Sequence, residues 1–376
     1  FAQLYSPQSV LPAISRSFGV APATAALAVS ASTIGLAAAV IPWSVVADHL
    51  GRVPAMSIGI VAATALGVIA PFSTGLGMLL GIRLLEGVAL GAVPAIALAY
   101  LSEEVDAAHA ATAAGGYIAG TTVGGLSGRL IAGPFADAGL WRIGVLAAAL
   151  ACAAAAIVFL VLVPRARGFT PHRARVERGP GLRARLAVNL RSPAQLALYA
   201  QGFLLMGAFV AVYNYLGFRL SAPPFGLSPW AVSLLFLAYL AGTVSSPQAG
   251  RLAARHGRLP VLIGSIVVMA AGALATAAPA TWAVIVGLLV FTAGFFAAHA
   301  VASGWAPVAA RPEARAQASS LYYLGYYAGS SLLGWALGFV FVDTGWAGVT
   351  TAVVLLCAAS AACASAWLSR IADDLR

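Results

Sequence analysis

The sequence contains no lysine and few charges of any kind. Only 9% of its 376 residues are charged, and all 21 basic residues are arginines. This composition excludes an ordinary soluble domain, in which about a quarter of the residues are charged. Eleven acidic residues leave a net charge of +10. In a soluble protein that excess would indicate nucleic acid or an acidic partner, but here the arginines lie mostly between long apolar runs.

Cysteine and enzyme motifs are also scarce or missing. Cys152, Cys357 and Cys363 fall inside apolar runs without metal-type spacing, which favours plain apolar packing. The sequence has no phosphate loop, no Gly-x-Ser-x-Gly motif and no long polar stretch that would hold an active site. We therefore expect no enzyme activity and no cofactor, with an ion gradient as the energy source.

Long apolar runs take up most of the chain. Hydrophobic residues make up 61% of it, and the mean hydropathy is +0.93. Runs of about 20 residues recur along its length, each long enough to cross a hydrocarbon layer of ~30 Å as a helix. They lack the alternation of apolar and polar residues that marks a transmembrane strand. The sequence therefore predicts an all-α membrane protein.

We expect twelve transmembrane helices in this sequence. The opening run of about 14 residues extends only roughly 21 Å as a helix, so we expect the sequence to begin partway through the first of them. The crossings are expected at 1–14, 24–47, 53–72, 76–101, 108–135, 141–163, 194–218, 230–250, 259–278, 282–307, 316–342 and 346–368.

A polar, arginine-rich stretch divides the chain into six crossings on each side. It carries eight arginines against the single Glu177, and arginine-rich loops stay on the cytoplasmic side of a membrane. We expect an N-terminal six-helix bundle at 1–163, a cytoplasmic linker at 164–193 and a C-terminal six-helix bundle at 194–376. Both termini are then cytoplasmic, and the lysine-free, alanine-rich composition favours the inner membrane of a bacterium.

The two halves repeat each other. The loop after the second crossing reads ADHLGRVP from Ala47 in one half and AARHGRLP from Ala253 in the other. Weaker echoes pair AGTTVGG with AGSSLLG, and DAGLW with DTGW. Such repetition is typical of secondary transporters, whose substrate site lies near the middle of the membrane between the halves.

These motifs resemble those of the major facilitator superfamily, and the resemblance covers essentially the whole chain. DHLGRVP is similar to its loop signature, and RLLEGVALGAVPA in the fourth crossing resembles its drug:proton antiporter branch, with Glu86 where glutamine is usual. GGYIAGTTVGGLSGR, with the Trp-Arg pair after it, resembles the multidrug and arabinose-type efflux permeases. The resemblance implies two pseudo-symmetric six-helix bundles that work by alternating access.

Arg83 and Glu86 are charged residues inside an otherwise apolar crossing. A charge at the centre of a lone transmembrane helix costs ~3 kcal/mol, so both are expected to face an interior cavity or a partner. Three residues apart on one helix face, they lie within pairing distance. Either they form a static ion pair, or Glu86 carries a proton while Arg83 favours its charged form and competes with a bound cation.

His299 and Arg129 are further polar residues inside crossings. His299 shares the coupled proton or binds substrate, or else it is a neutral histidine hydrogen-bonded to a neighbouring helix. Arg129 follows glycines at every fourth position over 116–128, a spacing that predicts close contact between helices. Arg129 itself is either an anion-binding or gating charge or a structural arginine paired with carbonyl groups.

Tyrosines gather in the eleventh crossing, where LYYLGYYAGSS forms adjacent stripes at helical spacing. Aromatic rings with a few hydrogen-bonding groups suit apolar, aromatic or cationic substrates, which stack on rings or make cation–π contacts. Packing between helices is the alternative for any single tyrosine. The expected cavity is lined by Tyr5, Gln8, Arg129, Tyr213, Asn214, Tyr322, Tyr323 and Tyr326.

Asp48, Gly51 and Arg52 form the core of the loop signature. The resemblance implies that the aspartate and the arginine help to close the cytoplasmic side when the transporter faces outward. A plain tight turn explains Gly51 without any gate. We expect a cytoplasmic gate, because Asp48 sits beside a helix end.

Together these features predict a secondary active transporter, and we expect proton-coupled efflux, by antiport, of small amphiphilic or drug-like compounds. A small-molecule substrate, protons and the lipid bilayer are the expected partners, nucleic acid is not, and the protein is expected to be a monomer. Export of a sugar or small metabolite without proton coupling is one alternative, because Asn214, Gln8 and Gln201 suit hydroxyl groups as well. A non-transporting membrane sensor or scaffold is another, although the sequence carries no signalling motif.

Overall fold

The computed structural model describes residues 1–164, 166 and 181–374, and these residues form helices and no β-strand. They divide into two compact units. The first comprises Phe1–Val20, Leu27–Glu177 and Ser228–Leu234, and the second Ala21–Ala26, Arg178–Leu227 and Leu235–Arg376. Residues 21–26 lie in the predicted N-terminal bundle but are grouped with the second unit. Residues 228–234 lie in the predicted C-terminal bundle but are grouped with the first unit. Half of the predicted linker, residues 165 and 167–180, lies outside the described residues.

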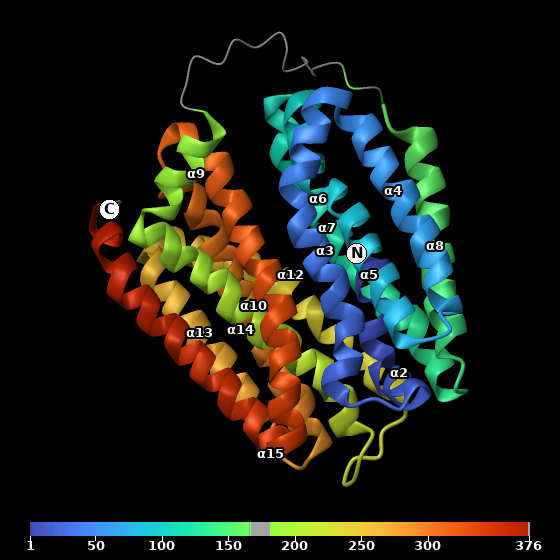
Figure 1. The fold of residues 1–376 in the computed structure, drawn as a ribbon. Coiled ribbons are helices and arrows are strands. Elements are labelled where there is room, and N and C mark those ends of the chain that lie inside the picture. Colours follow the sequence, from blue (N-terminus) through green and yellow to red (C-terminus); the bar gives the residue numbers. More distant parts are fainter. Residues whose placement is uncertain (165, 167–180, 375–376) are drawn as a thin grey trace. The chain divides into compact units, whose positions relative to one another are not determined.

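The helices of the first half follow the expected crossings, with breaks inside two of them. The first crossing is interrupted by a 3₁₀ turn, and the fourth is divided at Gly91. In this half α4 lies beside α5 and α8 (Figure 1). The elements are α1 (Ala2–Tyr5), η1 (Ser6–Val10), α2 (Leu11–Phe18), α3 (Pro22–Leu50), α4 (Arg52–Ile69), η2 (Ala70–Phe72), α5 (Leu76–Leu90), α6 (Ala92–Glu104), α7 (Ala107–Asp137) and α8 (Trp141–Leu162).

The second half begins with a short helix that the sequence did not predict. This helix, α9 (Leu182–Leu190), falls within the expected linker. A 3₁₀ turn again interrupts one crossing, the eighth, and α10 runs along α15 (Figure 1). The other elements are α10 (Pro193–Leu220), α11 (Pro229–Leu234), η4 (Leu235–Tyr239), α12 (Leu240–His256), α13 (Arg258–Ala275), α14 (Thr281–Val308), η5 (Pro312–Ala314) and α15 (Arg315–Asp374).

Many of these helices are suited to a bilayer. Within the described residues, nine helical segments are long and apolar enough to cross a membrane. The segment Pro312–Ser369 has 58 residues, roughly 87 Å of helix, which is far too long for one crossing. Gly345 breaks it with a φ of 66°, so α15 contains the eleventh and twelfth expected crossings. The expected all-α membrane fold is confirmed.

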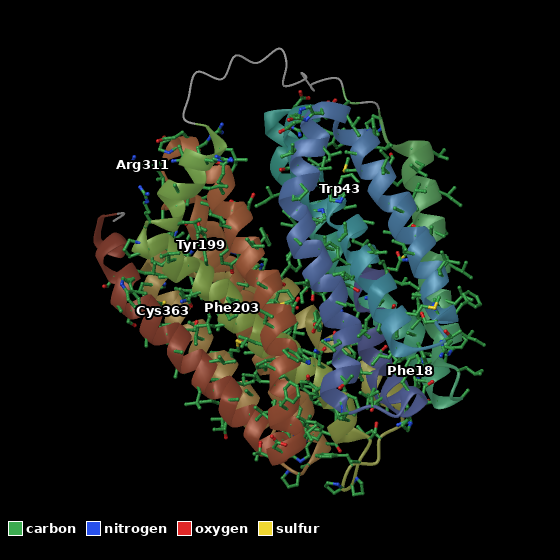
Figure 2. All side chains as sticks on the ribbon, viewed as in Figure 1. Phe18, Trp43, Tyr199, Phe203, Arg311 and Cys363 are labelled. Carbon is green, nitrogen blue, oxygen red and sulfur yellow. The ribbon has the colours of Figure 1, made fainter. Side chains whose placement is uncertain are left out.

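Glycines allow α3 and α5 to approach each other closely. A Cβ atom at Gly87 would clash with the carbonyl oxygen of Ser32, and one at Gly35 would clash with the backbone of α5. Trp43, which is labelled in Figure 2, also reaches across, because its indole N–H donates to the Val88 carbonyl at 2.7 Å. This hydrogen bond adds to the close packing of α3 against α5.

Gly87→Ala is expected to destabilise the protein by about 1–3 kcal/mol, because the backbone of α3 or α5 must move to admit the methyl group. Gly81→Ala is the matched control on the same helix, since a Cβ there meets nothing within 4 Å. Thermal unfolding of the purified protein in detergent compares the two. Equal unfolding temperatures would contradict the close approach.

The glycine run of α7 differs from its expected role. A Cβ at Gly128 would clash with the backbone of Ala2, so that glycine does serve close helix contact. Gly124 is only within ordinary contact distance of α1, and Cβ atoms at Gly116 and Gly120 would meet nothing within 4 Å. Within the described residues, close helix contact is therefore found at the end of the run that lies next to Arg129.

Close packing in the second unit joins α10 to α15. A Cβ at Gly329 would clash with the Phe203 carbonyl, and one at Gly325 would lie 3.0 Å from the Tyr199 carbonyl oxygen. Figure 2 labels Tyr199 and Phe203 on α10. The two backbones run against each other there, and this packing fixes the helix that carries the tyrosine stripes.

Candidate functional site

Arg83 and Glu86 form a buried ion pair in the first unit. The guanidinium Nη1 donates to Glu86 Oε2 at 2.6 Å, and the two side chains are 1% and 0% exposed. Both come from α5, one turn apart, as the three-residue spacing predicts. The pair as such is confirmed, while its part in proton transfer stays a hypothesis.

Main-chain carbonyl groups hold the Arg83 guanidinium from two other helices. Nη2 donates to the Leu4 carbonyl at 2.6 Å, Nη1 to the Gln3 carbonyl at 3.1 Å, and Nε to the Ala28 carbonyl at 2.9 Å. The Gln3 side chain in turn donates to the Ala63 carbonyl at 2.9 Å. The 3₁₀ turn η1 begins just after Leu4 and Tyr5. Arg83 thus joins the first, second and fourth crossings, and three of its four hydrogen bonds do not involve Glu86.

Glu86 is bonded through only one of its oxygens. Oε2 accepts from Arg83, while Oε1 has no hydrogen-bonding partner within the part of the chain that the structure describes. An ionised carboxylate has lone pairs on both oxygens, and leaving one of them without a donor in a dry interior is unfavourable. Among the described residues of the first unit, the buried hydroxyls of Ser30 and Ser32 also lack a partner, but Glu86 is the carboxyl group in this state.

Arg129 lies in a second polar group, which contains two more of the predicted cavity residues. Its Nε donates to Gln8 Oε1 at 2.8 Å, and Nη1 donates to the Gly125 carbonyl at 2.6 Å. The guanidinium carbon lies 4.4 Å from the centre of the Tyr5 ring. Arg129 is 1% exposed. The first and fifth crossings are therefore joined by Tyr5, Gln8 and Arg129, as a cluster in the first unit.

His299 lies among the predicted tyrosines in the second unit. Its Nδ1 is 2.9 Å from the Tyr322 hydroxyl oxygen, and its ring centre is 4.8 Å from that of Tyr326 and 6.2 Å from that of Tyr323. Phe295 stacks against it at 5.9 Å. We call Phe295, His299, Tyr322, Tyr323 and Tyr326 the aromatic cluster. Tyr323 is 36% exposed and Tyr322 only 1%, while His299 and Tyr326 are half-buried, so Tyr323 is the most exposed member of the cluster.

The polar residues predicted for the seventh crossing are buried within the second unit. Tyr213 is 1% exposed, and its hydroxyl shares a 2.7 Å hydrogen bond with Thr292 Oγ1. Asn214 is also 1% exposed, and its Nδ2 donates to the Gly334 carbonyl at 3.3 Å. These two residues join α10 to α14 and α15.

The loop signature forms an ion-pair network with a partner that the sequence did not indicate. Arg52 Nη1 donates to Asp48 Oδ1 at 2.7 Å. Its Nε and Nη2 donate to the two oxygens of Glu103 at 3.1 and 2.8 Å. Gly51 has a φ of 98° and Gly257, in the repeated loop, a φ of 89°, so both turns need glycine. Glu103 lies at the end of the fourth crossing, 51 residues away from Arg52.

Two arginines have matching roles that sequence reasoning missed. Arg142 donates to the carbonyls of Pro71 and Ser73, at the end of the third crossing, and lies 4.6 Å over the Trp141 ring. In the second unit Arg219 donates to the carbonyls at the end of the ninth crossing, Ala277 and Ala278, and lies 4.9 Å over the Trp346 ring. The two tryptophans come from the repeated DAGLW and DTGW segments. This repeat was the sequence feature that could have indicated the two arginine contacts.

Comparisons with known proteins agree with this architecture. The family model of the Major Facilitator Superfamily matches residues 1–239 and 220–375. The inner membrane transport protein YnfM of Escherichia coli K12 is 40% identical over 356 residues, which cover 95% of this chain and 84% of that protein. The uncharacterized MFS-type transporter YybF of Bacillus subtilis 168 is 34% identical, over 95% of this chain and 87% of its own.

Two solved structures show the same fold. A mutant form of the nucleoside transporter NupG superposes with a TM-score of 0.76 at 16% identity, and the match covers 98% of this chain and 96% of that one. A bacterial homolog of the human lysosomal transporter Spinster has a TM-score of 0.72 at 14% identity, with 99% and 93% of the two chains covered.

The helical fold, the internal repetition and the charges inside apolar helices together define a multi-pass membrane transporter. The chain belongs to the Major Facilitator Superfamily. It is a transporter and not an enzyme.

Proposed function

We propose that this transporter exports small amphiphilic or drug-like compounds in exchange for protons, and that Glu86 carries the proton. The observation behind the proposal is the state of the Glu86 carboxyl group, which is 0% exposed and has one oxygen on Arg83 and one without a hydrogen-bonding partner within the described residues. A proton on that second oxygen removes a buried negative charge that is only half satisfied.

The anchoring of Arg83 supports a change of protonation at this site. Carbonyl groups of Gln3, Leu4 and Ala28 accept from its guanidinium. When Glu86 takes up a proton, Arg83 keeps these three partners and stays in place. A static buried pair also uses such acceptors, because a guanidinium has five N–H donors and Glu86 accepts from one nitrogen only. The carbonyl groups therefore permit a neutral Glu86 without requiring one. The site therefore suits a carboxyl group that is charged in one step of a cycle and neutral in another.

The aromatic cluster supports an amphiphilic substrate. Cations are attracted to the faces of tyrosine rings, and flat apolar groups stack on them. Tyr323 is the most exposed member of the cluster, and His299 is hydrogen-bonded to Tyr322. In the second unit we assign substrate binding to the aromatic cluster, with a polar contact to His299 in place of proton transfer, and in the first unit we propose Tyr5, Gln8 and Arg129 as substrate contacts. Tyr213 and Asn214 are 1% exposed and bonded to α14 and α15, so we assign them to helix packing.

Export is the direction supported by the resemblance of the fourth crossing to drug:proton antiporters and of the fifth to multidrug and arabinose-type efflux permeases. We also propose a bacterial inner membrane with both termini in the cytoplasm and a monomeric protein. The relative YnfM is named as an inner membrane transport protein, and the arginine-rich central stretch favours the cytoplasmic side.

Uncoupled export of a sugar or small metabolite is the second candidate. NupG is named as a nucleoside transporter, but its 16% identity relates it to this chain by fold alone. A site for hydroxyl-rich substrates needs amide and hydroxyl groups that are open to them. The Gln201 amide donates to the Ser360 and Ala197 carbonyls and is 0% exposed. This residue serves helix packing, which weakens the case for a sugar.

Substrate-driven proton movement in proteoliposomes decides between the two candidates. Purified protein is reconstituted with a pH-sensitive dye inside and is challenged with lipophilic cations, sugars and nucleosides. Proton movement on addition of a lipophilic cation supports exchange with protons. Flux of a sugar or nucleoside without proton movement would support the second candidate.

We further propose that Asp48, Gly51 and Arg52 form part of a cytoplasmic gate, together with Glu103. Asp48→Asn is expected to lower the transport rate at least tenfold with little loss of folded protein, because Arg52 keeps both bonds to Glu103 and exposed ion pairs contribute only about 0–1 kcal/mol to stability. Transport and thermal unfolding are measured on the same preparation. Wild-type transport in this variant would remove Asp48 from the gate.

A further inference from the structure

Four exposed arginines gather at one end of the second unit. Arg183 lies on α9, Arg191 follows its last turn, and Arg311 and Arg315 flank η5. We call these four residues the α9 patch. Figure 2 labels Arg311 at the end of the unit where Figure 1 labels α9. None of the four takes part in the gate, the ion pair or the aromatic cluster.

Buried amide groups hold the two segments of the patch together. Asn189 is 1% exposed, and its Nδ2 donates to the Ala314 carbonyl at 3.0 Å. The Gln195 side chain, also 1% exposed, donates to the Ala306 carbonyl at 2.8 Å. Asn189 thus fixes α9 to η5, and Gln195 fixes the start of α10 to the end of α14. These hydrogen bonds from side chains to backbone carbonyls hold together the two segments that carry the arginines.

The positive charge of the patch exceeds the acidic charge of its two segments. Within the described residues none of the four arginines forms an ion pair, and the acidic residue of the two segments is Glu313 alone. Four like charges held together repel one another, so the site favours anions. Arginine binds phosphate groups well, because its planar guanidinium donates two parallel hydrogen bonds.

Exposed leucines border the same patch. Leu182 and Leu190 of α9 are 42% and 49% exposed, and Leu196 in the first turns of α10 is 46% exposed. The membrane-spanning helix α10 begins at Pro193, three residues after α9 ends. The short helix therefore directly precedes a candidate membrane span, and leucines and arginines are neighbours in its sequence. Such a mixture is typical of helices that lie in the interface and contact anionic lipid.

We propose that the α9 patch binds the head groups of anionic phospholipids. Arg183, Arg191, Arg311 and Arg315 contact lipid phosphate groups, and the exposed leucines enter the boundary between head groups and acyl chains. This places α9 in the surface of the leaflet, where it ties the start of α10 to the membrane. The inference concerns lipid binding alone and stands independently of the transported substrate.

Native mass spectrometry of the full chain in detergent, titrated with phosphatidylglycerol or phosphatidylcholine, tests the proposal. Wild type is expected to bind phosphatidylglycerol more tightly. Arg191→Gln with Arg315→Gln is expected to weaken that binding roughly tenfold or more, since each arginine near an anionic surface contributes about 1 kcal/mol. The matched control is Arg251→Gln with Arg255→Gln, which removes two exposed arginines of α12 and is expected to change binding less than the patch variant does.

Two further measurements separate lipid from other anions. Leu182→Ser with Leu190→Ser leaves every arginine in place and is expected to weaken phosphatidylglycerol binding as well. Millimolar inorganic phosphate is expected not to displace the lipid. Equal losses in the patch and control variants, or displacement by phosphate, would overturn the proposal. Thermal unfolding in phosphatidylcholine alone identifies a variant that has failed to fold, and the leucine variant then provides the test.

Discussion

Arg83→Met is expected to leave little folded protein in the membrane. The substitution removes four hydrogen bonds at once and leaves Glu86 as a buried carboxylate without a counter-charge. Breaking a buried ion pair by removing one partner costs about 3–5 kcal/mol, a large part of the stability of most domains. The measurement is thermal unfolding in detergent together with the amount of monodisperse protein recovered from the membrane. Arg16→Met, at an exposed arginine of α2, is the control and is expected to behave as wild type.

The double variant Arg83→Met with Glu86→Leu separates the structural part of the pair from its functional part. Replacing both charges by apolar groups of similar size avoids the unpaired carboxylate. We expect folded protein to return at least in part, without any substrate-driven proton movement. Recovery of proton movement in the double variant would show that neither residue carries the proton. An Arg83→Met variant as stable as wild type would contradict the anchoring described here.

Tyr323→Leu is expected to raise the KM for a lipophilic cation roughly fivefold to thirtyfold, whereas Tyr323→Phe stays close to wild type. Tyr323 is the most exposed member of the aromatic cluster, with its ring edge-on to Tyr322 and Tyr326 at 5.7 and 6.0 Å. A cation over an aromatic ring gains about 1–2 kcal/mol when water is excluded. Phenylalanine retains that ring face, and leucine does not.

Initial rates of uptake into inverted vesicles measure this effect. Trp282→Leu is the matched control, because Trp282 is an aromatic residue of α14 that is 72% exposed and lies in none of the ring contacts of the cluster. A neutral sugar or nucleoside, if transported, should show a smaller change in KM. A change of equal size in the leucine and phenylalanine variants would mean that the hydroxyl group, and not the ring, contacts the substrate.

The sequence predicted features that depend on short spacings. Arg83 and Glu86 were expected to pair because residues three apart share a helix face, and they do. The repeated turns at Gly51 and Gly257 could also be predicted from the matching sequences around them, and the two glycines have similar φ angles. Composition and apolar runs were sufficient to predict the helical membrane fold. A segment that crosses lipid must hydrogen-bond its own backbone N–H and C=O groups, and an apolar run of this length does so as a helix.

The partners that come from distant parts of the chain were not predictable. Glu103 reaches Arg52 from 51 residues away, and Ala28 accepts from Arg83 across 55 residues. Such contacts depend on helix tilt and rotation, which spacing does not encode. The 3₁₀ turns inside two crossings and α9 were also missed, because a break of one turn inside an apolar run, or a short helix inside a polar stretch, leaves the overall pattern unchanged.

Substrate-driven proton movement in Glu86→Gln tests the central claim most directly. Glutamine has nearly the same shape as glutamate and can still accept from Arg83, so the packing around the pair is kept. Proteoliposomes with an internal pH-sensitive dye are challenged with a lipophilic cation, and exchange of labelled substrate is measured in the same preparation. We predict proton movement in wild type, and in the variant none, with substrate exchange retained. Proton movement at the wild-type rate in Glu86→Gln would contradict the account.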